Sequence, residues 1–213
     1  MAMLNSTKAV LRLAGVLLLA TLVASGVRAA ETVDPKQETP HELIEKVTDV
    51  MFDVVGQYNN GDLNTEEYYS EVQALLEPVV DFPFIAKAVM GSHRSEASEE
   101  QVERFAEVFK SGLVTTYAKG IASYADSDIR IQPPGEGVKD ERRVSVHQEV
   151  KHDGSTYRLS YTMAKNRSGE WKLINLVLDG VNLGRSFRSQ FSQAVKTQGG
   201  NIDKVIDTWL DEM

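Results

Sequence analysis

The sequence of 213 residues contains no cysteine, so disulfides, thiol nucleophiles and cysteine-ligated metals are excluded. It also has only four histidines. His147 and His152 are five positions apart on a predicted strand, so they point to opposite faces and cannot share a metal ion. His41 falls in the first turn of a predicted helix and His93 in a polar loop, where surface roles are expected. We therefore expect no metal site and no cofactor.

Motifs for covalent catalysis and nucleotide binding are also missing. The sequence has no G-x-S-x-G elbow and no glycine-rich phosphate loop, which excludes the common serine-hydrolase and P-loop sites. Most carboxylates fall in helix caps and on solvated helix faces. The exception is Asp179, beside Gly180 at the end of an apolar strand. It could act as a general base, or it could close a turn by accepting hydrogen bonds from nearby amides.

Acidic residues outnumber basic ones. The chain carries 23 basic and 31 acidic residues, a formal net charge of −8. Loss of residues 1–29, which hold three basic residues and no acidic ones, would make this −11. Such a charge argues against nucleic acid and anionic lipid surfaces as partners. It permits docking on a basic patch of another protein, although the acidity could also serve solubility alone.

A long apolar run is present only at the start of the chain. Lys8 and Arg12 precede the apolar stretch 13–25, and Val27-Arg28-Ala29 fits a small-residue cleavage site. This pattern predicts a secretory signal peptide over residues 1–29, cut near Ala29. The alternative is an uncleaved anchor, but the run is shorter than the ~20 residues that span a bilayer. We expect residues 30–213 to form a single exported domain without stable membrane insertion.

The first half of that domain has helical periodicity. Thr39-Pro40-His41-Glu42 predicts a capping box, and further cap signals begin at Asn64 and Ser98. The stretch 81–91 predicts a short helix that ends at Gly91. Apolar residues then recur at helical spacing from Val102 to Ile121. We therefore expect helices over 39–124.

The second half changes to the alternation of strands. Residues 127–180 predict four antiparallel strands in a meander, with a hairpin turn at Asp153-Gly154. Two helices over 184–212 follow, separated by Gly199-Gly200. The expected fold is α+β, with a helical half, a curved antiparallel sheet of the cystatin or NTF2-like kind and closing helices. Such a sheet, partly wrapped by helices, often leaves a pocket between the layers.

The last predicted strand, within 169–180, is apolar on both faces. Strict alternation gives one face Trp171, Leu173, Asn175 and Val177, and the other Lys172, Ile174, Leu176 and Leu178. Both faces therefore need a cover. Helices on both sides would provide it, and so would helices on one side and a ligand on the other.

Three stretches are the most informative, namely DFPFIAKAVMG at 81–91, FAEVFKSGLVTTYAKGIASY at 105–124 and GEWKLINLVLDGVNLGRSFRSQF at 169–191. Together they resemble the MlaC family of periplasmic phospholipid-shuttle proteins, also called toluene-tolerance proteins. The first is similar to the family's D-F-x-x-I-A-x-x-V-x-G segment, and the third to its G-x-W, G-V and R-S-Q-F elements. Two departures are Ile174-Asn175, where the family often has Tyr-Asp, and Asn182, where it often has Ser.

This resemblance implies a carrier that holds phospholipid acyl chains in a hydrophobic pocket. It would carry lipid between an outer-membrane lipoprotein–porin complex and an inner-membrane ABC transporter, and so maintain outer-membrane lipid asymmetry. The implied protein is not an enzyme. The alternative is an enzyme on an NTF2-like scaffold, with Asp179 and Tyr157 or Tyr161 as its cavity acid and base.

The pocket wall expected on this interpretation combines the apolar strand with the aromatic helix stripe. Each of its residues could instead be ordinary core. The expected lipid-binding residues are Phe105, Phe109, Leu113, Tyr117, Tyr161, Met163, Leu173, Val177, Val181 and Phe187. The phosphate should stay at a wet mouth, because burying it unpaired is costly. We place that mouth at 180–185, where Arg185 and Arg188 could bind the headgroup or remain merely solvated.

Overall fold

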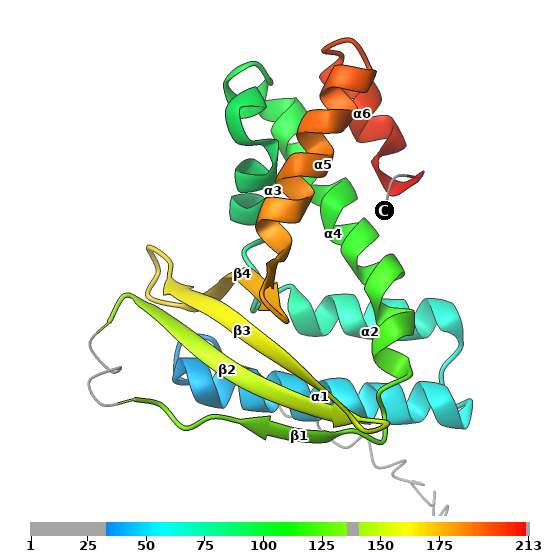
Figure 1. Cartoon of the computed structure of the whole chain (residues 1–213), viewed down its shortest axis with the longest axis vertical. Coiled ribbons are helices and arrows are strands. Elements are labelled where there is room, and N and C mark those ends of the chain that lie inside the picture. Colours follow the sequence, from blue (N-terminus) through cyan, green and yellow to red (C-terminus); the bar gives the residue numbers. More distant parts are fainter. Residues whose placement is uncertain (1–32, 136–140, 212–213) are drawn as a thin grey trace, which may run out of the picture. The chain divides into compact units, whose positions relative to one another are not determined.

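The structure, a computed structural model, describes residues 33–135 and 141–211. The predicted signal peptide lies outside these residues. All described residues fall within one compact unit, Glu31–Met213. Figure 1 shows the elements, which are α1 (Pro40–Asn60), α2 (Thr65–Leu76), α3 (Phe82–Met90), the 3-10 helix η1 (Gly91–Ser95), α4 (Glu99–Ala122), β1 (Asp128–Ile131), β2 (Arg143–His152), β3 (Ser155–Lys165), β4 (Trp171–Leu178), β5 (Val181–Asn182), α5 (Leu183–Thr197), α6 (Ile202–Thr208) and the 3-10 helix η3 (Trp209–Asp211).

The helices begin where the cap signals place them. The Thr39 side chain accepts a hydrogen bond from the Glu42 N–H at 3.3 Å, and the Glu42 carboxylate accepts one from the Thr39 N–H at 2.8 Å. Asn64 and Ser98 head equivalent capping boxes at α2 and α4. Each box satisfies amide groups that the first helical turn leaves unpaired. The predicted helical half is thus confirmed.

The sheet is an antiparallel meander in the order β1-β2-β3-β4-β5. Asp153 and Gly154, with φ of 46° and 75°, form the predicted tight turn between β2 and β3. Asp179 and Gly180 form a second turn of this kind, with φ of 45° and 82°. The chain then pairs briefly with β4 as β5. The sequence predicted four strands and missed β5 because a two-residue strand has no alternation to detect.

A β-bulge in β4 changes which of its residues share a face. Met163 pairs with Leu173, but Thr162 pairs with Asn175, so Ile174 is an extra residue. The prediction of strict alternation along β4 is therefore wrong. We call the face that contacts α1 the inner face and the opposite one the outer face. The bulge places four apolar residues of β4 together on the inner face, namely Trp171, Leu173, Leu176 and Leu178. Asn175 and Val177 lie on the outer face.

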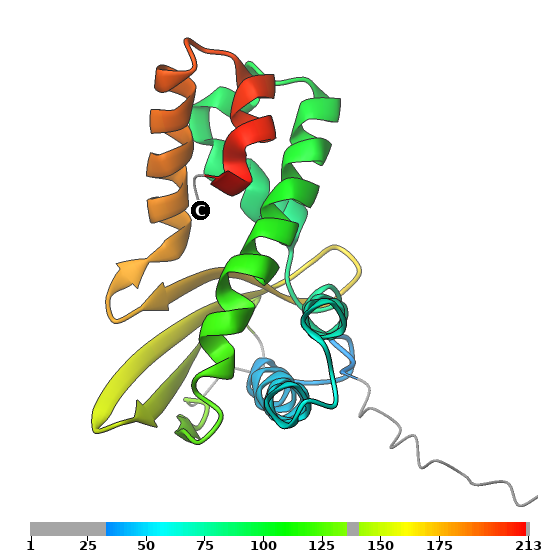
Figure 2. The ribbon, with the colours of Figure 1, turned by 90° about the vertical axis from the view of Figure 1, so that its right-hand side faces the viewer.

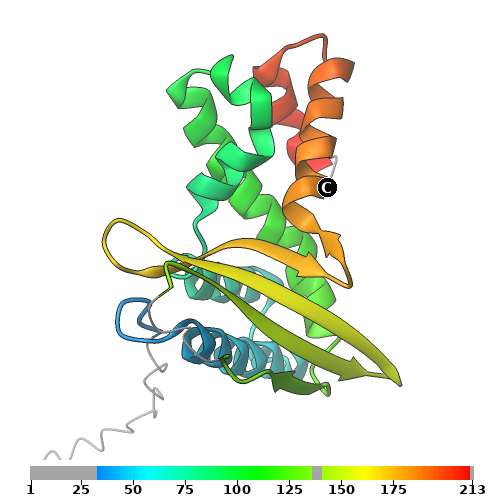
Figure 3. The same ribbon diagram turned by 60° about the vertical axis from the view of Figure 1, so that its left-hand side comes forward.

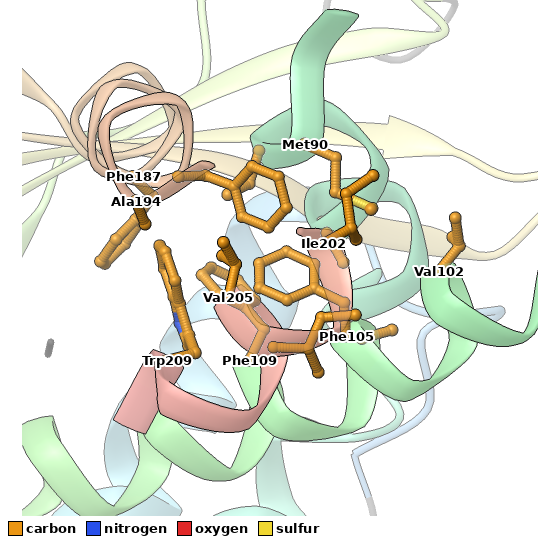
Figure 4. Packing of buried hydrophobic residues seen from close by; sticks show 14 of the residues in the cluster. Met90, Val102, Phe105, Phe109, Phe187, Ala194, Ile202, Val205 and Trp209 are labelled. Carbon is orange, nitrogen blue, oxygen red and sulfur yellow. The ribbon is translucent and has the colours of Figure 1, made fainter. Parts of the chain in front are cut away.

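Buried residues form three separate hydrophobic clusters. The bundle core joins α3, α5 and α6 to the first half of α4, and in Figure 4 Phe105, Phe109 and Trp209 lie at its centre. The second, which we call the hairpin core, joins α1 and α2 to the last turns of α4. The third, the sheet core, joins α1 to the inner face. α4 therefore belongs to two of the three cores.

The inner face is turned toward α1, α2 and α4. In Figure 2 α4 passes in front of the sheet, and in Figure 3, from the opposite side, it passes behind. The chain before α3 is joined to β4, because the Asp81 N–H donates to the Leu173 carbonyl and the Leu173 N–H to the Val79 carbonyl, at 3.0 and 2.8 Å. α3 and α5 thus both start at β4.

Candidate functional site

A set of apolar residues lies between the three cores without belonging to any of them. Leu159 pairs with Leu178 and Tyr161 with Leu176 across β3 and β4, so these side chains share the inner face. The three leucines are only half-buried. Val181, opposite Leu178 on β5, is 54% exposed. Together with Tyr117 of α4, which is 44% exposed, we call Leu159, Leu176, Leu178 and Val181 the apolar surface.

Two aromatic contacts join α4 and the residues just after it to neighbouring elements. The Tyr117 ring of α4 lies 6.5 Å from the Phe187 ring of α5. The Tyr124 ring, just beyond the end of α4, lies 5.5 Å from the Tyr157 ring near the start of β3. Of the leucines of β3 and β4, Leu159, Leu176 and Leu178 are part of none of the three cores, whereas Leu173 packs against the sheet core. Leu113, on the same stripe of α4 as Tyr117, is also half-buried.

A chain of side-chain hydrogen bonds fixes the sheet to α1 beside the apolar surface. The Tyr161 hydroxyl donates to Gln148 Oε1 at 2.5 Å, and Gln148 Nε2 donates to Thr48 Oγ1 at 3.1 Å. The Thr48 hydroxyl donates to the Ile44 carbonyl at 2.7 Å. Gln148 is only 3% exposed, and this chain satisfies both ends of its amide. Burial raises the pKa of Tyr161, so its hydroxyl stays a neutral donor.

The first turn of α5 touches β4 closely. A Cβ added to Gly184 would lie 2.7 Å from Asn175 Oδ1, so only glycine fits there without a shift. Asn182 caps this helix by accepting a hydrogen bond from the Arg185 N–H at 3.0 Å. Both predicted headgroup residues, Arg185 and Arg188, are exposed. Arg188 Nε donates to the Ala88 carbonyl of α3 at 2.7 Å, so part of its guanidinium already joins α3 to α5.

The predicted wall residues fall into three groups. Phe105, Phe109 and Phe187 are in the bundle core, and Met163 is in the sheet core. Val177 is on the outer face, and it lines a small pocket of about 250 Å³ together with outer-face residues such as Ser160 and with Leu159 of the inner face. The remaining five are half-buried or exposed: Leu113 packs against the bundle core, Tyr161 and Leu173 pack against the sheet core, and Tyr117 and Val181 are exposed.

Three residues of the apolar surface were not predicted as wall. Leu176 and Leu178 were assigned to the face opposite Leu173, and the bulge brings them onto the same face. Leu159 was seen only as part of an alternating strand. Knowing that Leu159 pairs with Leu178 would have identified Leu159 as part of this surface. The sequence of a single strand, however, does not specify the register in which it pairs with its neighbour.

The residues of the alternative enzymatic site are engaged separately. Asp179 is exposed in the turn after β4, where its carboxylate accepts a hydrogen bond from the Arg158 N–H at 2.8 Å. The Tyr161 hydroxyl donates to Gln148 instead. Asp179 thus has the local turn role. Within 33–135 and 141–211, no group of three or more His, Asp or Glu residues could hold a metal ion.

The same residues include no helix that is both long and apolar enough to cross a bilayer. A second pocket, of about 480 Å³, lies between α1 and β1, and no residue of the apolar surface lines it.

Comparisons with known proteins agree on one family. The sequence model of the family described as MlaC protein matches residues 45–211. The chain is 32% identical over 179 residues to the toluene tolerance protein ttg2D of Pseudomonas putida, covering 83% of this chain and 82% of that protein. It is 26% identical over 183 residues to the intermembrane phospholipid transport system binding protein MlaC of Haemophilus influenzae, covering 83% and 81%.

The fold also matches a solved structure. A phospholipid-binding protein from Ralstonia solanacearum, determined in complex with a phospholipid, superposes with a TM-score of 0.72 at 23% identity. The match covers 82% of this chain and 96% of that one. The mixed helix-and-sheet fold predicted from the sequence is therefore confirmed.

Proposed function

The chain belongs to the MlaC family, and from this premise we propose that it is a soluble periplasmic carrier whose apolar surface binds phospholipid acyl chains. The observation that carries the proposal is a set of half-buried leucines on the inner face, Leu159, Leu176 and Leu178, that belong to none of the three cores. The names of the relatives support the same ligand, since one is a phospholipid transport protein and the solved structure holds a phospholipid.

The energetic need for such a carrier is large. Each methylene exposed to water costs ~0.8 kcal/mol, so two acyl chains of roughly 30 methylenes cost on the order of 20 kcal/mol. Free diffusion of a phospholipid between membranes is therefore negligible. The carrier replaces water with apolar side chains. We place Leu113, Tyr117, Tyr161, Leu173 and Val181 in the wall, together with Leu159, Leu176 and Leu178, and leave Val177 and the buried core residues outside it.

The headgroup remains near the start of α5 in this proposal. Arg185 is exposed there, and no hydrogen bond or ion pair engages its side chain among the described residues. We assign it to the phosphate, with Arg188 as a second cation that also joins α5 to α3. The polar headgroup then stays hydrated while the chains lie against the apolar surface.

We further propose that the carrier works between two membranes. It passes lipid between an outer-membrane lipoprotein–porin complex and an inner-membrane ABC transporter, and so maintains outer-membrane lipid asymmetry. The signal peptide predicted over residues 1–29 supports export to the periplasm. No catalytic step is required, because extraction and release are binding events.

Mass spectrometry of solvent extracts from the purified protein tests the ligand. The proposal expects phospholipid near one molecule per protein, and transfer of labelled phospholipid between vesicles when delipidated protein is added. Reproducible absence of lipid, together with no transfer, would show that the apolar surface does not bind phospholipid. It would favour a protein that acts as an adaptor and binds no small ligand.

A further inference from the structure

The pocket between α1 and β1 is lined by none of the residues of the apolar surface and has its own chemistry. Its volume is about 480 Å³, and its apolar lining comes from Phe52, Ile129 and Ile131. Phe52 is half-buried, yet it belongs to none of the three cores. We call this pocket the α1–β1 groove.

One side of the groove is acidic. Glu45, Asp49 and Asp53 line it at intervals of four residues, so their carboxylates follow one stripe along α1. All three are exposed, and none forms an ion pair or a side-chain hydrogen bond with another described residue. None of the described groove residues is basic. Like charges at this spacing destabilise a helix slightly, and a cation in the groove would remove that repulsion.

The other side of the groove is the free edge of the sheet. Among the described residues, β1 pairs only with β2. The Gln132 N–H donates to the His147 carbonyl at 2.9 Å, so Gln132 belongs to a hydrogen-bonded pair of the β1–β2 ladder. Pairs of this kind alternate along an antiparallel ladder. The backbone groups of Ile131 and Ile129 therefore point away from β2, toward the outside edge. These two residues also line the groove.

We propose that the α1–β1 groove is a docking site for an extended basic segment of a partner protein, which adds to β1 as a further strand. The unpaired N–H and C=O groups of Ile129 and Ile131 supply backbone hydrogen bonds to the added strand. Ile129, Ile131 and Phe52 receive its apolar side chains. Glu45, Asp49 and Asp53 select lysine or arginine in it. This inference does not depend on the lipid function, because no residue of the apolar surface lines the groove.

The test uses the full chain and a fluorescein-labelled lysine–valine heptapeptide, with binding measured by fluorescence anisotropy. We expect saturable binding that weakens as salt rises toward about 150 mM, where the Debye length shortens to ~8 Å. Asp49→Asn should weaken binding about threefold, in the range of one exposed ion pair. Glu71→Gln, an equal charge change on α2, should leave it unchanged. Equal binding of a glutamate–valine peptide would overturn the proposal that Glu45, Asp49 and Asp53 select basic residues.

A second pair of variants tests the strand edge. Ile131→Pro removes an N–H that points away from β2, so it breaks no hydrogen bond to β2, and proline is tolerated at such positions of edge strands. It should weaken peptide binding about tenfold. Ile131→Val keeps that N–H and should bind as the parent chain does. Unchanged binding by Ile131→Pro and Asp49→Asn, with folding verified by circular dichroism, would overturn the proposal. So would displacement of the peptide by Ca²⁺ alone, or a concentration-dependent dimer that excludes the peptide, since the groove would then hold a cation or a second copy.

Discussion

Replacing Leu176 with glutamate should abolish phospholipid retention, whereas the same change at the next residue, Val177, should leave it nearly intact. The bulge in β4 puts Leu176 on the inner face with Leu159 and Leu178, and puts Val177 on the outer face. The two substitutions add the same charge one position apart. Their difference therefore reports which face of β4 contacts the acyl chains.

The expected magnitudes follow from burial. A carboxylate against an acyl chain is buried without a partner and costs several kcal/mol; ~3 kcal/mol already weakens lipid binding more than 100-fold. Without lipid, both positions are half-buried, so the new carboxylate remains hydrated. Losing about half of a leucine's 1.5–3 kcal/mol burial energy costs ~1 kcal/mol, and lowers Tm by about 2–4 °C in a domain of this size.

The assay has two readouts. Mass spectrometry gives the phospholipid-to-protein ratio after purification, and thermal denaturation of delipidated protein gives the folding cost. Phe105→Ala serves as the core control, because Phe105 is fully buried in the bundle core and its truncation should cost about 3–5 kcal/mol. Lipid retention by Leu176→Glu, or equal loss in Leu176→Glu and Val177→Glu, would refute the placement of the chains on the inner face.

Three further predictions concern the surroundings of the site. Gly184→Ala should destabilise the protein by about 1 kcal/mol through contact with Asn175 Oδ1, and a second change, Asn175→Ala, should restore the Tm; no recovery would disprove this contact. Arg185→Ala should reduce retention of anionic phospholipid without changing Tm, and full retention would remove Arg185 from the headgroup site. Arg188→Ala should lower Tm, because it loses the hydrogen bond to the Ala88 carbonyl. Burial, with a contribution from His147, lowers the pKa of His41 below 6.5. The unfolded chain therefore binds a proton at His41 more tightly than the folded chain does. Stability should be complete above pH 6.5 and decline as pH falls toward the lowered pKa, and denaturation profiles of His41→Gln should lack that decline.

Local signals predicted the helices and turns well because the physics that sets them is local. A capping box at Thr39 and Glu42 is specified by four consecutive residues, and it forms as expected. The same holds for the Asp153-Gly154 turn, whose positive φ angles suit those two residue types. Neither feature requires knowledge of what lies opposite in space.

Register and packing partners could not be predicted in this way. The bulge at Ile174 exists only as a mismatch with β3, and it reverses the face of everything that follows in β4. The stripe of α4 shows the same limit. Phe105 and Tyr117 occupy one stripe, yet Phe105 is fully buried and Tyr117 is 44% exposed. A helical period identifies a stripe but not the element that covers it, so wall and core residues had the same signature.

The division of the interior into three cores connects stability to the proposed function. α4 contributes to the bundle core through Phe105 and Phe109 and to the hairpin core through Val114 and Ala118, so it holds both in place along a single helix. Merging the three clusters would bury the apolar surface and stabilise the empty protein. It would also remove the apolar area to which the proposed function assigns the lipid. A ligand that fills this space stabilises the folded state by mass action, by about 2.7 kcal/mol at a free concentration 100 times its Kd. In the proposed function, the half-buried leucines Leu176 and Leu178 are thus where bound lipid would supply contacts that the protein does not.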